Sequence, residues 1–339
     1  MGNRPTIRDV AKLADVSIAS VSRALTRPES VKEKTRDRVI EAARSIGFQL
    51  NRQAIDFRRG RSDALIVLVS DIANPFYPEF FKGIEKEARE RGFTVLIGDT
   101  AGGPQSESTY VGMLASGKAD GLISNIGRLP QGIPSPVEIE DSYQGPPIVA
   151  CNHDAGAKIP MVRIDNYSAG KAAAEHLLQL GHRRFAQIHG SLEFSDFRAR
   201  LTGFSDTVAS AGFPIPANLL VPGGLRVQSG RDAAEKLLSQ TDMPTAIFAH
   251  NDEMALGAIH QLSLSGLRVP ADVSVMGFDD LSYASATMPT ITTMRLPREA
   301  WGAAACKKLI DQILGTDSGV HDQMLPAELI VRESTAPHS

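Results

Sequence analysis

The stretch DVAKLADVSIASVSRALTRPESV, from Asp9 to Val31, decides the fold of the first part of this 339-residue chain. Apolar residues recur in it at helical spacing, but Asp15 and Val16 interrupt the run and a second helical run follows at once. The pattern predicts two helices joined by a tight turn.

Capping residues and a glycine set the limits of these helices. Thr6 followed by Asp9 is a capping-box pattern, Ser17 can cap the second helix, and a third helix over about 33–45 ends near Gly47. Three short helices with a tight turn between the first two form a helix-turn-helix unit. The side chains that we expect inside it are Ile7, Val10, Ala11, Leu13, Val21, Ala24, Leu25, Val39, Ile40 and Ala43.

Charge is distributed unevenly along the chain. Residues 1–61 contain 14 Lys and Arg against 7 Asp and Glu, a net charge of +7. The remaining residues contain 22 basic and 32 acidic side chains, a net charge of −10. A basic head on an acidic body indicates that the head, and not the body, meets a polyanion.

From Ala64 onward, apolar strand-like runs alternate with amphipathic helical stretches. The first runs are ALIVLVSDI (64–72), FTVLIGDT (93–100) and ADGLISNI (119–126). This alternation predicts an α/β fold with parallel sheets covered by helices. The number of predicted strands is larger than one sheet usually contains, so we expect two similar lobes.

Several features common in other classes of protein are missing from the sequence. The first residues lack the apolar segment of a signal peptide, and no apolar run approaches the ~20 residues of a membrane helix, so we expect a cytoplasmic protein with no membrane contact. Two cysteines, Cys151 and Cys306, exclude a disulfide framework. Phosphate-binding loops, HExxH and GxSxG are absent. We therefore expect no enzyme activity, no cofactor and no bound metal.

Polar side chains stand at the ends of successive predicted strands, where ligands bind in parallel α/β folds. Each of them could instead be a helix cap or a turn former, and that alternative stays open. These residues are Asp71, Asn74, Asp99, Asn152, Asp165, Asn251, Asp252, Asp279 and Asp280.

The chain resembles the LacI/GalR family of bacterial transcription regulators over nearly its whole length. The segments TIRDVAKLADVSIASVSRAL and KTRDRVIEAARSIGFQLN resemble the DNA-binding part of that family, and RIDNYSAGKAAAEHLLQLGHRR, HNDEMALGAI and VSVMGFDDLSYASATMPTITTMR resemble its effector domain. The resemblance implies a head over 1–48, a hinge over 49–61 and an effector-binding and dimerisation body over 62–339. It implies that this body is shaped like periplasmic sugar-binding proteins, with lobe 1 over about 62–163 and 292–325 and lobe 2 over about 164–291 and 326–339.

In a helix-turn-helix protein, the second helix lies in the major groove of double-stranded DNA. Arg23 is the best candidate for a bidentate contact to guanine, and Ile18 and Ala19 stand where the family varies its operator choice and can touch a thymine methyl. In the hinge, Phe57 replaces the leucine that the family wedges into the minor groove. The residues that the resemblance assigns to DNA are Thr6, Ser17, Ile18, Ala19, Ser20, Ser22, Arg23, Asn51, Ala54 and Phe57.

For the small-molecule effector, the resemblance assigns a carboxylate, amides, a guanidinium and an aromatic ring to one cleft. Such a set can hold vicinal hydroxyl groups and cover an apolar sugar face, so we expect a sugar or sugar derivative. Because Arg226 lies near this cleft, a sugar acid stays open, and so does a purine. The assigned residues are Asp71, Asn74, Phe76, Asn152, Arg200, Asn251 and Asp279.

Together these observations predict a homodimeric repressor that binds a nearly palindromic operator and is controlled by a metabolite. A corepressor-dependent regulator with a purine-type ligand is the first alternative. A sugar-binding transport protein, which would share the two-lobed body, is the second.

Overall fold

The computed structural model describes residues 5–26, 28–48, 61–101, 103–134, 143–152, 159–316 and 322–338. Contacts divide the chain into two compact units, Met1–Ser62 and Asp63–Ser339, which we call the head and the body. Within the described ranges, no helix combines the length and the apolar character needed to cross a membrane.

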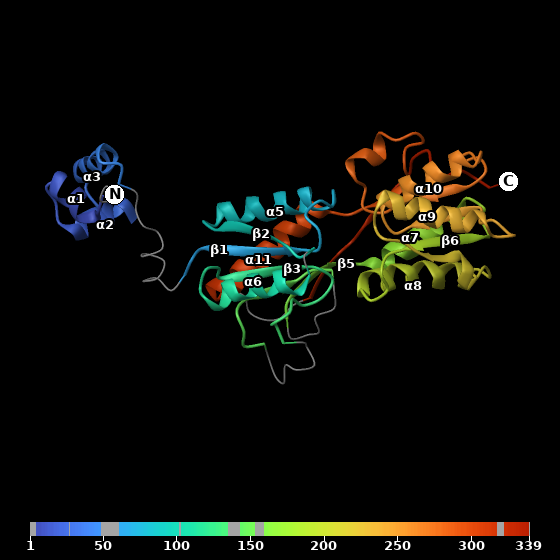
Figure 1. The fold of residues 1–339 in the computed structure, drawn as a ribbon, viewed down its shortest axis with the longest axis horizontal. Coiled ribbons are helices and arrows are strands. Elements are labelled where there is room, and N and C mark those ends of the chain that lie inside the picture. The colour runs from blue at the N-terminus through green and yellow to red at the C-terminus, as the bar shows by residue number, and fades with distance from the viewer. Residues whose placement is uncertain are drawn as a thin grey trace. The chain divides into compact units, whose positions relative to one another are not determined.

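The described residues of the head form three α-helices and one turn of 3-10 helix (Figure 1). The elements are α1 (Ile7–Leu13), α2 (Ile18–Thr26), η1 (Pro28–Ser30) and α3 (Glu33–Ser45). The predicted capping box is confirmed, because the backbone N–H of Thr6 donates to Asp9 Oδ2 at 2.8 Å. Gly47 follows α3 in a left-handed conformation, as expected of a helix stop.

A small apolar core holds these helices together. Val10, Val21 and Val39, one from each helix, are completely buried in it. The prediction that Leu13 points inward is wrong, since its side chain is 56% exposed. Val10, Ala11 and Ala14 occupy the buried stripe of α1, and Leu13 lies outside that stripe.

Lobe 1 of the body is built on a six-stranded parallel sheet with strand order β11-β5-β4-β3-β1-β2. The body begins with β1 (Ala64–Val69), whose five residues after Ala64 are all buried. The other elements of this lobe are α5 (Tyr77–Glu90), β2 (Thr94–Asp99), α6 (Pro104–Ala115), β3 (Gly121–Asn125), β4 (Ile148–Ala150), β5 (Met161–Ile164), α11 (Arg298–Leu314) and β11 (Asp322–Leu325).

Lobe 2 repeats this architecture on a four-stranded parallel sheet of order β7-β6-β8-β9. Figure 1 shows helices on both faces of each sheet. The elements of lobe 2 are α7 (Asn166–Gln179), β6 (Phe185–His189), α8 (Ser195–Ser210), η2 (Ala217–Leu219), β7 (Leu220–Pro222), α9 (Val227–Leu238), β8 (Ala246–Ala249), α10 (Asp252–Leu264), β9 (Ser274–Met276) and η3 (Ser282–Ser285).

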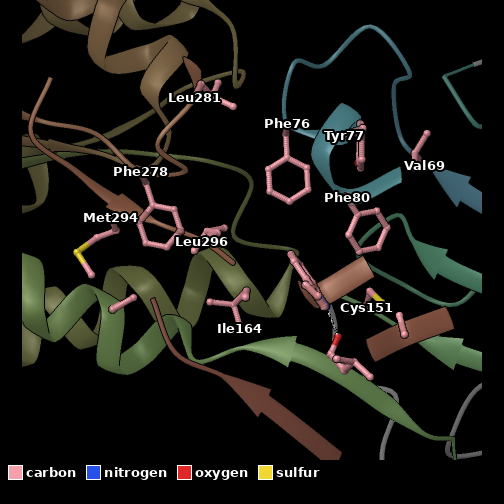
Figure 2. Packing of buried hydrophobic residues seen from close by; sticks show 14 of the residues in the cluster. Val69, Phe76, Tyr77, Phe80, Cys151, Ile164, Phe278, Leu281, Met294 and Leu296 are labelled. Carbon is pink, nitrogen blue, oxygen red and sulfur yellow. Dashed lines mark hydrogen bonds between the residues drawn. The ribbon is translucent and has the colours of Figure 1, made fainter. Parts of the chain in front are cut away.

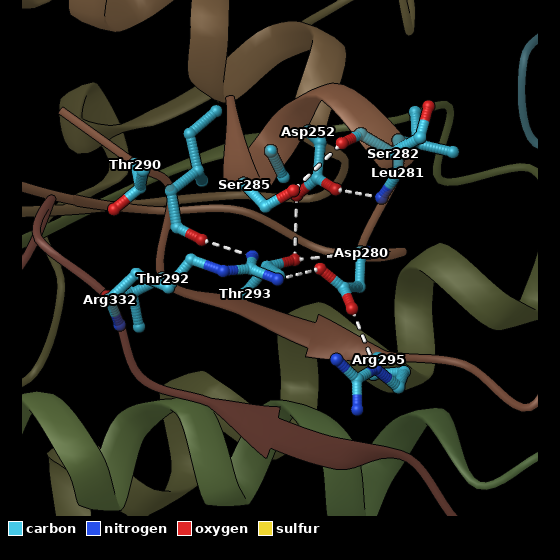
Figure 3. A network of polar contacts seen from close by, with 12 residues as sticks. Asp252, Asp280, Leu281, Ser282, Ser285, Thr290, Thr292, Thr293, Arg295 and Arg332 are labelled. Carbon is cyan, nitrogen blue, oxygen red and sulfur yellow. Dashed lines mark hydrogen bonds and ion pairs between the residues drawn. The ribbon is translucent and has the colours of Figure 1, made fainter. Parts of the chain in front are cut away.

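The chain passes between the lobes three times, and the last two passages pair as the antiparallel strands β10 (Thr293–Arg295) and β12 (Glu328–Ile330). Asp280 binds both of these passages. Its carboxylate accepts from Arg295 at 2.7 Å and from Arg332 at 2.6 Å (Figure 3). One carboxylate at the end of lobe 2 thus ties the two connecting segments together.

The largest apolar cluster of the body spans both lobes. Phe76 and Phe80 from lobe 1 belong to it, and so does Phe278 from lobe 2 (Figure 2). Phe248 from lobe 2 is a further member. Trp301 of α11, completely buried, lies edge-on to Phe80 and donates its indole N–H to the carbonyl of Val162 at 2.7 Å. The two lobes therefore share one continuous core near the passages between them.

Candidate functional site

One face of α2 is the candidate DNA-reading surface of the head. Ser17, Ile18, Ala19 and Arg23 are exposed on it, while Ser20 and Ser22 are half-buried. Ile18 leaves 46% of its side chain exposed.

Hydrogen bonds fix the start of this helix. The Ser17 hydroxyl accepts the backbone N–H of Ser20 at 3.1 Å and lies 2.9 Å from the Ser20 hydroxyl. Arg23 donates from Nε to the carbonyl of Ala19 at 3.3 Å, which leaves its terminal guanidinium nitrogens for another partner. Thr6 lies exposed just before α1, whereas Asn51, Ala54 and Phe57 of the expected hinge fall outside the described residues.

The body contains a cavity of about 120 Å³ between its two lobes. Six of the seven residues predicted to bind an effector line it: Asn74, Phe76, Asn152, Arg200, Asn251 and Asp279. The residues of its lining that were not assigned to the effector from the sequence are Ser70, Tyr77, Asn125, Ile126, Gly127, Phe194, Asp196, Phe197, Leu225, His250 and Leu296.

Asp71, the seventh predicted residue, does not line the cavity. Its carboxylate forms an ion pair with Arg226, which also lies 3.4 Å from Glu253. Asp71 also accepts the backbone N–H of Ala73 at 2.9 Å, the geometry of a turn former.

Two of the side-chain amides in the cavity wall form hydrogen bonds to nearby backbone groups. Asn251 caps α10 by accepting the backbone N–H of Met254 at 2.8 Å, and its amide donates to the carbonyl of Leu225 at 3.0 Å. Asn74 accepts the backbone N–H of Phe76 at 2.9 Å. These bonds place the ring of Phe76 and the backbone of Leu225 at the cavity.

Arg200 is held in place by other side chains. Its Nε and Nη2 donate to the side-chain oxygen of Asn166 at 3.1 and 2.7 Å, and Nη1 donates to the carbonyl of His250. The guanidinium also stacks on the ring of Phe278, 3.3 Å from its centre. Burial lowers the pKa of Arg200 to about 10, so the group stays charged at neutral pH.

Two carboxylates near Arg200 have oxygens free for a ligand. Within the described ranges, neither Asp196 nor Asp279 has a hydrogen-bonding partner for its carboxylate, and Arg200 acts on both only as a nearby charge. Burial raises the pKa of Asp196 to about 6 and that of Asp279 to about 7. Asp279 also adopts a φ of 105°, which is rare for a residue with a side chain and common at binding sites.

Two further buried polar atoms in the cavity wall lack a partner among the described residues: Asn125 Nδ2 and His250 Nδ1. Asn125 accepts from the Asn152 amide through its oxygen, so its own amide nitrogen is left to donate. His250 contacts the side-chain oxygen of Gln187 through Nε2 at 3.0 Å, which leaves Nδ1 as an acceptor. The cavity thus offers acceptors from Asp196, Asp279 and His250 and a donor from Asn125.

The amino-acid sequence matches two family models in chain order. Residues 6–51 match the model of bacterial regulatory proteins of the lacI family, and residues 62–333 match that of periplasmic binding proteins and the sugar-binding domain of the LacI family. The second match alone covers most of the chain. This protein belongs to the LacI family.

The curated and solved relatives described next match this LacI-family protein over nearly its whole length. It is 36% identical over 331 residues to the transcriptional repressor CytR of Escherichia coli K12, which covers 97% of this chain and 96% of CytR. It is 27% identical to a lac repressor dimer solved with operator and an anti-inducer, with a TM-score of 0.86 over 98% of this chain and 100% of that one. A complex of the regulator CelR with cellobiose is 31% identical, with a TM-score of 0.74 and the same coverage.

Membership of the LacI family assigns roles to the two units. The head is the DNA-binding domain, and the body is the ligand-binding domain of a transcription regulator. The expected parallel α/β architecture and the family resemblance are both confirmed. The roles of the individual site residues stay predictions.

Proposed function

We propose that this LacI-family regulator is a homodimeric repressor in the cytoplasm that binds a nearly palindromic operator through α2, and that a neutral sugar in the body cavity controls its affinity for that operator. The choice of effector rests on the carboxylates of Asp196 and Asp279, which have no hydrogen-bonding partner among the residues that the structure describes. They lie beside a guanidinium that other side chains already bind.

The polar groups of the cavity favour a ligand that is rich in hydrogen-bond donors. Carboxylate oxygens and a neutral imidazole nitrogen accept hydrogen bonds, and sugar hydroxyls can donate to them. Asn125 Nδ2 then donates to a hydroxyl or ring oxygen of the same ligand. Phe76, Phe194 and Phe197 supply aromatic surface for the apolar face of a sugar ring.

The charges around the cavity disfavour a sugar acid. Arg226, the residue that kept an anionic ligand open, is paired with Asp71 and Glu253 and does not line the cavity. An anionic ligand would lie next to the carboxyl groups of Asp196 and Asp279, and the nearby guanidinium of Arg200 is already bound by Asn166 and by the carbonyl of His250.

The exposed face of α2 supports the proposed reading of operator DNA. Arg23 can make a bidentate contact to guanine from its terminal nitrogens, and Ile18 can touch a thymine methyl. The similarity to a lac repressor dimer bound to operator supports the dimer and the operator symmetry.

The test is a DNA-binding assay with the full-length protein at 0.15 M salt. DNA from upstream of its own gene is compared with random DNA of equal length, with and without each member of a panel of neutral monosaccharides, sugar acids and purines. We expect a preference of about a thousandfold for the upstream DNA, and relief of that binding by a neutral monosaccharide. A response to a sugar acid or a purine alone would contradict the proposed effector.

Two variants separate the two sites in this assay. Arg23→Ala should lose about 1 to 3 kcal/mol of operator discrimination, yet keep weak, salt-sensitive DNA binding. Asp279→Ala should keep operator binding and lose the response to the sugar. Normal discrimination by the first variant, or a normal response by the second, would overturn the corresponding assignment.

A further inference from the structure

An ion pair joins the two lobes at the rim of the cavity. Asp71 lies in the loop between β1 and α5 of lobe 1, and Arg226 immediately precedes α9 of lobe 2. Glu253, in the first turn of α10, lies 3.4 Å from the same guanidinium. Asp71 and Arg226 are each 39% exposed and Glu253 is 13% exposed, so the triad is partly shielded from water.

Each member of this triad stands within three residues of a side chain that lines the cavity. Asp71 precedes Asn74, Arg226 follows Leu225 directly, and Glu253 follows Asn251. A movement of the cavity wall is therefore transmitted to the ion pair through very short pieces of backbone.

The backbone next to Arg226 is also conformationally restricted. Leu225 adopts a φ of 62°, a left-handed conformation that is uncommon for a branched side chain. The amide of Asn251 donates to the carbonyl of Leu225 at 3.0 Å and the backbone N–H of Arg226 donates to the hydroxyl of Ser229 at 3.2 Å, so the arginine is held at the rim from both sides.

We infer that Asp71 and Arg226 form a latch that holds the lobes together across the cavity. Glu253 anchors Arg226 to lobe 2, and Asp71 is the part that separates from it when the lobes move apart. The latch biases the equilibrium between closed and open lobes, and thereby sets how readily a ligand enters or leaves. Asp71 is thus a positioning residue that acts through Arg226 and not a ligand contact.

This inference goes beyond the proposed function and needs neither its effector nor its operator. The experiment measures the distance between the lobes by pulsed electron paramagnetic resonance, with spin labels at Glu90→Cys on α5 and Glu235→Cys on α9. Cys151 and Cys306 are buried, so the introduced thiols react first. Labelled full-length chain is diluted into excess unlabelled chain, so that a labelled dimer carries its spin labels on only one of its two protomers.

The parent should give a predominantly closed distribution. Arg226→Gln and Asp71→Asn should each raise the ratio of the open to the closed population by about two- to fivefold, the size expected for a partly exposed ion pair. The double variant should behave like either single variant, since both remove the same interaction. Raising NaCl from 0.05 to 1 M should move the parent toward the variants and leave Arg226→Gln unchanged.

Arg268→Gln is the matched control. It removes an arginine whose ion pair with Asp272, at 2.8 Å, lies entirely within lobe 2. It should leave the distribution of the parent unchanged. Equal distance distributions for the parent and for both latch variants would overturn the latch. So would a shift in Arg268→Gln as large as the shift in the latch variants. Neither result would bear on the proposed repressor function.

Discussion

At the scale of single residues, Asp252 is a completely buried carboxylate that holds two segments of the chain together. It accepts the backbone N–H of Leu281 at 2.7 Å and the hydroxyl of Thr293 at 2.7 Å (Figure 3). Burial raises the pKa of Asp252 to about 8, and the nearby charge of Asp279 contributes to the same rise. The side chain is therefore mostly protonated at neutral pH.

A raised pKa in the folded state makes stability fall as the pH rises. Below about pH 4 both the folded and the unfolded chain hold the proton, and between pH 4 and 8 only the folded chain does. Asp252→Asn mimics the protonated acid and should reduce the loss of Tm between pH 5 and 8. The loss should not vanish, because the pKa values of Asp196 and Asp279 are also raised.

Asp252→Ala is the contrasting variant. It leaves the N–H of Leu281 and the hydroxyl of Thr293 without their acceptor, which should cost about 2 to 4 kcal/mol at pH 5. The cost should be smaller at pH 8, because the parent itself loses stability as Asp252 ionises. Thermal unfolding of both variants and the parent at pH 5, 6.5 and 8 checks this. A pH dependence as steep in Asp252→Asn as in the parent would show that another group is responsible.

The sequence predicted only part of the lining of the cavity. Of the polar residues expected at strand ends, Asn74, Asn152, Asn251 and Asp279 line the cavity and the other five do not. Several of the nine serve as caps or turn formers, such as Asp165, which accepts the backbone N–H of Ser168. Asp279 is free of such a duty. Asp196 and Asn125 reach the cavity from the start of α8 and the end of β3, and no local pattern distinguishes them because their role depends on how the two lobes meet.

At the scale of elements, three helix pairs of the body pack through glycines: α5 with α11, α7 with α8, and α9 with α10. One glycine on each helix lies against the backbone of the other, so that an added Cβ would overlap a carbonyl oxygen. This contact brings α8, which carries Arg200, close to α7. The six glycines are Gly83, Gly302, Gly170, Gly203, Gly230 and Gly257.

Gly203→Ala tests this close packing. The new methyl group would overlap the carbonyl oxygen of Tyr167 on α7, and the helices must separate to admit it. We expect a loss of about 1 to 3 kcal/mol in the free energy of unfolding. Gly112→Ala on α6 is the matched control, because nothing lies within 4 Å of its added Cβ, and it should stabilise by about 0.5 to 1 kcal/mol. Urea denaturation distinguishes them, and equal effects would refute the packing argument.

At the scale of the whole molecule, the alternation of strands and helices was sufficient to predict two parallel α/β lobes. It could not show that α11 and β11 return to lobe 1 after the sheet of lobe 2 is complete, because that return depends on contacts between residues far apart in the sequence. The pairing of β10 with β12 and the contacts of Asp280 with Arg295 and Arg332 depend on the same return of the chain. The family resemblance supplied these boundaries where local patterns did not.

The division of charge between head and body predicts how random DNA is bound. A head of net charge +7 binds the DNA phosphates and releases their counterions, whereas a body of net charge −10 repels the phosphates. Lys12→Gln, on the exposed side of α1, removes one positive charge from the head and should therefore make the slope of log affinity against log salt shallower by about one unit. Lys236→Gln, on the exposed side of α9, should leave that slope unchanged. Fluorescence anisotropy with a random duplex between 0.05 and 0.2 M salt measures both, and a shallower slope for the Lys236 variant would mean that the body also binds DNA.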